Sequence, residues 1–129
     1  MSINTARLII VLIGVTLPYL ARLPFGVDWL KQYTDIGLGG WIFFGVLNAV
    51  AWGAILAISF KYKRSKPLAF PCLFGFGFLA WAHGTLDLSA DAQAAIALVF
   101  IPIFALLPIA VGGVIGYFID RRASQNELD

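Results

Sequence analysis

Lys61-Tyr62-Lys63-Arg64-Ser65-Lys66-Pro67 is the stretch that decides the fold, because it places four positive charges in six residues between two long apolar runs. A basic segment in this position is typical of a short loop that joins two membrane-spanning helices. The 129-residue chain around it is 60% hydrophobic and 12% charged, with a mean hydropathy of +0.88. This composition excludes an ordinary soluble domain, which carries about twice that share of charged residues.

Four apolar runs predict four membrane spans in one domain, at about residues 6–23, 40–60, 68–88 and 91–119. The first run, Leu8 to Ala21, would rise only about 21 Å, which is short of a hydrocarbon core of about 30 Å. Arg7 and Arg22 flank this run, and their long side chains can extend the span. No pair of small residues suited to signal cleavage ends the run, so we expect an uncleaved first helix. The predicted fold class is an all-α membrane bundle of four helices.

The segment 25–36 between the first two spans is too polar to cross a membrane. On a helix, at about 100° per residue, its apolar and polar side chains fall on opposite sides. The apolar side holds Phe25, Trp29, Leu30, Tyr33 and Ile36, and the polar side holds Asp28, Lys31, Gln32, Thr34 and Asp35. We therefore expect a short amphipathic helix in the headgroup region, with a plain loop as the alternative.

Lysine and arginine are distributed unequally between the two sides that four spans create. One side holds Arg7, the four basic residues of the turn and two after the last span, whereas the other holds only Arg22 and Lys31. Seven against two predicts that both termini and the turn 61–67 are cytoplasmic, in an inner membrane. The expected topology anchors are Lys61, Lys63, Arg64, Lys66, Arg121 and Arg122, and residues 120–129 are expected to form a polar tail.

Two rows of small residues at four-residue spacing predict helix packing, because small side chains let a second helix backbone approach closely in lipid. The row in the second span consists of Gly45, Ala49, Gly53 and Ala57, and the row in the fourth of Pro108, Gly112 and Gly116.

A few polar side chains within or beside the spans are candidates for a site. Asn48 lies near the middle of the second span and should face protein or water. His83 and Asp87 are one helical turn apart, so they can meet, and Asp87 can also pair with Arg22. Together they suggest an outward-facing pocket with Asn48 at its floor and His83 and Asp87 on its wall. The pocket could bind a ligand or carry protons, or the same residues could be purely structural.

Catalytic machinery is missing from the sequence. Thiol–disulfide chemistry needs paired cysteines, and Cys72 stands alone. The sequence has no cluster of His and acidic residues that would predict a metal site. His83 would be able to supply one axial ligand to haem if a partner supplied the other. Asn48, Phe74 and Phe78 resemble the asparagine and phenylalanine pair of small fluoride channels. The third span lacks the Thr/Ser-rich break of those channels, so the sequence assigns no family.

The sequence therefore predicts a membrane protein that is not an enzyme, with no cofactor, no metal and no nucleic-acid partner. The leading hypothesis is an interaction or accessory protein, of the assembly or immunity type, that binds another membrane protein or a second copy of itself. The alternative is a small transporter, channel or ligand-binding protein that uses His83, Asp87 and Asn48.

Overall fold

The computed structural model describes residues 1–129, and every regular element in it is helical. In chain order the elements are α1 (Ile3–Leu20), η1 (Leu23–Phe25), α2 (Val27–Thr34), α3 (Gly37–Ser59), η2 (Lys66–Leu68), α4 (Ala69–Thr85) and α5 (Ala94–Asn126). Four segments are long and apolar enough to cross a membrane, namely Ile3–Phe25, Gly37–Ser59, Lys66–Thr85 and Ala94–Asn126. The predicted all-α chain with four candidate spans is confirmed.

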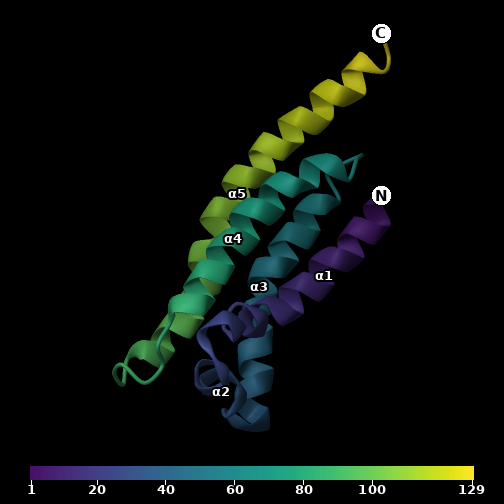
Figure 1. Ribbon diagram of the computed structural model, residues 1–129. Helices are drawn as coiled ribbons and strands as arrows, with labels where there is room; N and C mark the ends of the chain where they lie inside the picture. Colours follow the sequence, from purple (N-terminus) through teal and green to yellow (C-terminus); the bar gives the residue numbers. More distant parts are fainter.

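The four long helices run side by side, and consecutive ones run in opposite directions (Figure 1). Both termini and the turn between α3 and η2 lie toward one end of the bundle, which we call the basic-turn end. Helix α2 and the connection between α4 and α5 lie toward the other end, which we call the α2 end. Helix α5 packs most extensively against α4 and then against α3, and α1 covers α3 and α4.

The apolar side chains are divided between a packed interior and an exposed surface. Interior residues with almost no exposed surface include Ile10, Ala51, Ile55, Leu79, Ala105 and Ile109. Other apolar side chains lie on the outside and are more than half exposed, including those of Leu8, Leu12, Ile42, Val46 and Leu107. Proteins in water avoid so continuous an apolar surface, whereas such a surface is suited to the hydrocarbon core of a membrane.

Two of the helix ends that differ from the predicted ends bear on the polar residues. Helix α4 ends at Thr85, because Leu86 takes an extended conformation with ψ of 120°. Helix α5 continues to Asn126, through the first part of the segment predicted to be a polar tail. Contacts with the basic turn hold this last stretch, since Arg64 donates to the carbonyl of Ala123 and forms an ion pair with Glu127.

Glycine makes the entry into α3 possible. Gly37 has a φ of +72°, a conformation that other residues rarely adopt, and it lets the chain turn from α2 into α3. The chain therefore changes direction between segment 25–36 and the second span at Gly37.

Candidate functional site

The guanidinium of Arg22 lies in the protein interior just after α1, and none of the residue is exposed. Its Nη1 donates to the backbone carbonyls of His83 and Leu86, at 2.7 Å each. Carbonyls at a helix C-terminus have no partner within the helix and carry partial negative charge. The positive charge of Arg22 is therefore stabilised by carbonyl oxygens at the C-terminus of α4 and not by a carboxylate. The only ion pair in the structure joins Arg64 and Glu127.

Helix α2 completes this cluster with three side chains. The indole N–H of Trp29 donates to the carbonyl of Gly84 at 2.7 Å, and the backbone carbonyl of Trp29 accepts from Nε of Arg22 at 2.8 Å. Gln32 Oε1 accepts from Nη2 of Arg22 at 2.8 Å. The ring of Tyr33 lies 4.0 Å from the guanidinium carbon, within range of a cation–π interaction. Helix α2 is thus held to α4 through the buried charge on Arg22.

Tyr33 is the most deeply buried residue of α2, with 1% of its surface exposed. Its hydroxyl oxygen lies 2.9 Å from Nδ1 of His83. Burial raises the pKa of Tyr33, and the nearby Arg22 only partly opposes this effect. The phenol is therefore neutral at physiological pH.

His83 is 1% exposed, and its ring lies edge-on to the rings of Tyr33 and Phe44 at centroid distances of 5.7 and 5.6 Å. It makes no hydrogen bond to Asp87, because α4 ends at Thr85 and the one-turn relation between the two residues is lost. Nε2 of His83 is buried and has no hydrogen-bond partner.

Asp87 lies in the connection after α4. Its Oδ1 accepts from the hydroxyl and backbone N–H of Ser89, at 2.7 and 3.0 Å, and from Nε2 of Gln32 at 3.0 Å. These hydrogen bonds, those from Ser89 foremost, lower the pKa of Asp87. Gln32 lies between the carboxylate and Arg22, so the expected direct pairing of Asp87 with Arg22 is replaced by a bridge through a carboxamide.

Asn48 faces the protein interior, as predicted, with 5% of its surface exposed. Its Nδ2 donates to the carbonyl of Gly14 in α1 at 2.7 Å, and its Oδ1 is buried without a partner. Asn48 borders a recess of about 250 Å³. The remaining walls are Val15, Tyr19, Trp41, Phe44, Gly45 and Trp52. The recess is therefore aromatic, and His83 and Asp87 do not line it.

The two rows of small residues have different surroundings. A Cβ added to Gly112 would lie 2.6 Å from the carbonyl oxygen of Phe70, and one added to Gly116 would lie 2.5 Å from that of Pro67. The α5 row is therefore in close contact with the α4 side of the bundle. A Cβ added to Gly45 or Gly53 would meet nothing within 4 Å, so no other helix of the chain packs closely on the glycines of the α3 row.

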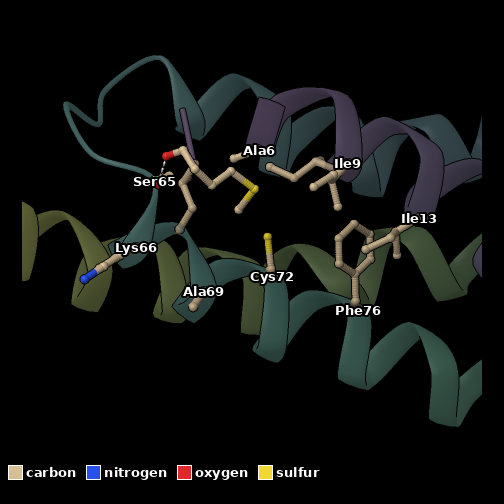
Figure 2. Close-up of a pocket in the computed structure, with 11 residues that line it drawn as sticks. Ala6, Ile9, Ile13, Ser65, Lys66, Ala69, Cys72 and Phe76 are labelled. Atoms are coloured by element: carbon tan, nitrogen blue, oxygen red, sulfur yellow. Dashed lines mark hydrogen bonds between the residues drawn. The ribbon is translucent and has the colours of Figure 1, made fainter. Parts of the chain in front are cut away.

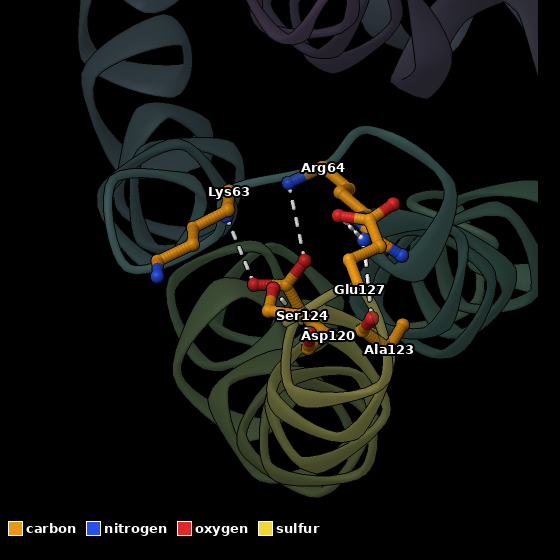
Figure 3. Close-up of polar contacts among 6 residues, drawn as sticks. All are labelled: Lys63, Arg64, Asp120, Ala123, Ser124 and Glu127. Carbon is orange, nitrogen blue, oxygen red and sulfur yellow. Dashed lines mark hydrogen bonds and ion pairs between the residues drawn. The ribbon is translucent and has the colours of Figure 1, made fainter. Parts of the chain in front are cut away.

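The basic turn is held by a buried carboxylate. Asp120 is 1% exposed and accepts from the backbone N–H groups of Lys63 and Arg64 at 2.9 and 3.1 Å (Figure 3). The hydroxyl of Tyr62 donates to the carbonyl of Gly113 at 2.6 Å. Burial, with a smaller contribution from Asp120, raises the pKa of Tyr62 to about 12. The turn is thus a fixed part of the bundle rather than a free loop.

Sequence reasoning did not single out Trp29, Gln32 and Tyr33 as parts of the Arg22 cluster. The amphipathic pattern correctly placed Trp29 and Tyr33 on one face of a helix, which was the available signal. The same pattern places Gln32 on the polar face, and the role of Gln32 depends on the three-dimensional proximity of Arg22 and Asp87.

No family model, characterised protein or solved structure matches this chain. The chain also contains no group of three or more His, Cys, Asp or Glu side chains that could together hold a metal ion. A functional interpretation therefore depends on the geometry of the helices themselves.

Proposed function

We propose that this chain is a multi-pass protein of the inner membrane, with both termini and the turn 61–67 in the cytoplasm. The support is the excess of seven basic residues over two, all seven belonging to segments of the basic-turn end. A reporter that works only in the cytoplasm should be active when it is fused after Asp129. Activity of a periplasmic reporter at the same position would contradict this orientation.

Helix α2 then lies at the opposite membrane surface, in the headgroup region. Phe25 and Val27 support this placement, because both are apolar yet 62% and 66% exposed beside the half-buried Trp29. Aromatic and aliphatic side chains at this depth are stabilised by contact with lipid at the interface.

The function that the geometry supports best is that of a non-catalytic interaction or accessory protein, whose α3 binds a transmembrane helix of another membrane protein. The observation that carries the proposal is the outward-facing row Gly45, Ala49, Gly53 and Ala57, which contacts no other helix of the chain at its glycines. From residue 45 to residue 57 the row covers about 18 Å, more than half of a hydrocarbon core of about 30 Å. Close backbone approach along such a row stabilises helix pairs in lipid.

The recess beside Asn48 indicates that a helix bound to this face should carry a hydrogen-bond donor. Gly45 belongs to both the row and the recess, and Oδ1 of Asn48 has no donor from its own chain. An unsatisfied acceptor costs free energy in a medium without water. A partner helix that carries a hydroxyl or amide at this level would supply the missing donor.

The alternative function is ligand binding or transport that uses His83, Asp87 and Asn48 as separate polar groups, since they do not line one pocket. It is favoured by the two buried polar atoms that lack partners, His83 Nε2 and Asn48 Oδ1. His83→Ala and Asp87→Asn should abolish activity under this alternative and should change only stability under the leading one.

The leading proposal is tested by purification in mild detergent with quantitative mass spectrometry. A membrane protein should be captured in stoichiometric amount by the wild type and lost by at least tenfold in Gly53→Leu, because the leucine side chain would separate the two backbones. Gly53 has open space around it, so this substitution should leave the monomer folded. Gly112→Leu is unsuitable, since Gly112 packs within the chain.

Phe43→Leu is the matched control, because Phe43 is 61% exposed on the same helix and points about 80° away from Gly53 at 100° per residue. Equal capture by wild type and Gly53→Leu would overturn the proposal. Co-purification of a second, differently tagged copy through the same row would make the protein a homo-oligomer and overturn the accessory assignment.

A further inference from the structure

A groove of about 500 Å³ lies between α1 and α4 at the basic-turn end (Figure 2). Its walls are apolar, with Ala6, Ile9 and Ile13 on α1 and Ala69, Cys72 and Phe76 on α4. The volume is within the range of small-molecule binding sites, about 300 to 1,000 Å³. The groove is separate from the α3 row and from the Asn48 recess, so it is independent of the proposed partner site.

Small side chains produce this groove. Ala6, Ala69 and Cys72 leave space between the two helices, and the side chains of Phe76 and Ile13 meet at the end away from the turn (Figure 2). From Ala69 to Phe76 the groove is about 10 Å long at 1.5 Å per residue. This length holds part of one extended hydrocarbon chain, whereas a helix needs a channel about 10 Å wide.

A free cation lies at the open end. Lys66 lines the mouth, is exposed, and extends its ammonium away from the apolar walls (Figure 2). It makes no ion pair, whereas the neighbouring Arg64 pairs with Glu127. Arg7, on α1, does not line the groove, and its guanidinium is engaged by Ser59 and by the ring of Phe60. Lys66 is therefore the basic side chain at the mouth that is available to an anion.

We propose that this groove binds an acidic phospholipid, with one acyl chain between α1 and α4 and the anionic headgroup at Lys66. An empty apolar groove would lose dispersion contacts along its walls, and a hydrocarbon chain restores them. The ammonium of Lys66 selects a net negative headgroup over a zwitterionic one, as basic sites beside transmembrane helices do. Phosphatidylglycerol has this chemistry.

The first test is competition in mild detergent between phosphatidylglycerol and phosphatidylcholine of identical acyl chains, with bound lipid counted by native mass spectrometry. The wild type should retain phosphatidylglycerol preferentially, and Lys66→Gln should lower this preference about fivefold, the effect of one cation near a headgroup. Lys63→Gln is the matched control, because Lys63 is exposed on the same turn and does not line the groove. Equal retention of both lipids, or equal effects of the two variants, would overturn the proposal.

The second test locates the chain with a phosphatidylglycerol that carries a photoreactive group in one acyl tail. Cross-links should fall within residues 6–13 and 65–76, and Ala69→Phe should reduce them severalfold because the ring would fill the groove. Leu73→Phe, at a position 70% exposed to the surroundings one turn along α4, should leave them unchanged. Cross-links spread evenly over all helices would mean non-specific surrounding lipid and would overturn the inference. So would cross-links concentrated in residues 110–118, which line a different groove.

Discussion

The two ends of the bundle each bury one charge, and the charges have opposite sign. At the α2 end, Arg22 is fully buried and donates to backbone carbonyls at the end of α4. At the basic-turn end, Asp120 is 1% exposed and accepts from two backbone amides of the turn. Neither forms an ion pair. In both cases fixed backbone dipoles take the place of a counter-ion.

The difference lies in how many groups each charge must satisfy. A guanidinium has five N–H donors, and Arg22 makes four hydrogen bonds, two of them to Trp29 and Gln32 from α2. A carboxylate has two oxygens, and those of Asp120 are each met by one amide of the turn, Oδ2 by Lys63 and Oδ1 by Arg64. The cation therefore organises a separate helix, whereas the anion fixes only a turn.

The largest effect is expected from removing the cation. Arg22→Met should lower the free energy of unfolding by about 3 kcal/mol, because it leaves two or three buried carbonyls without donors at roughly 1 to 3 kcal/mol each. Unfolding in mixed micelles measures this loss, and limited proteolysis should show segment 23–36 released from α4. Lys31→Met is the control, since Lys31 is exposed on α2 and should cost less than about 0.5 kcal/mol. Equal losses for the two variants would contradict the organising role of Arg22.

A smaller effect is expected from removing the anion. Asp120→Ala should cost about 2 kcal/mol, because two charge-assisted hydrogen bonds are lost while the penalty of burying the charge is relieved. Hydrogen exchange at the amides of Lys63 and Arg64 should accelerate, with α2 unaffected. Asp120→Asn keeps a single carboxamide acceptor and should cost about half as much. A loss no greater than that of Asp28→Ala, at an exposed acid, would show that the turn is held by other contacts.

The smallest effect at neutral pH is expected from Tyr62, the phenol nearest the buried anion. Tyr62→Phe removes the hydrogen bond to Gly113 and should cost about 1 kcal/mol. The pKa of Tyr62 is about 12 in the folded protein and about 10 when unfolded, so its contribution is complete below pH 10 and lost as the pH rises toward 12. Unfolding measured from pH 8 to 12 should show a shallower alkaline loss in the variant, and an unchanged pH profile would contradict the assignment.

The sequence located the candidate spans but was less informative about the site. Asn48 was expected to face protein and does so, and the row on α5 packs as small residues predict. The expected meeting of His83 with Asp87 assumed a helix through residue 87, whereas α4 ends at Thr85. The carbonyls at the end of α4 accept hydrogen bonds there from Arg22 and Trp29, which are distant in sequence. Local periodicity carries no information about such contacts.

The sequence by itself determined the helical class, the four apolar runs and the concentration of basic residues around Lys61 to Pro67, because composition and spacing encode these properties directly. Only the tertiary structure decided which small-residue row is occupied, since both rows have the same spacing and only packing distinguishes Gly112 from Gly53. It also decided how the buried charges are satisfied. Their partners are backbone groups, which every residue carries and no sequence pattern marks.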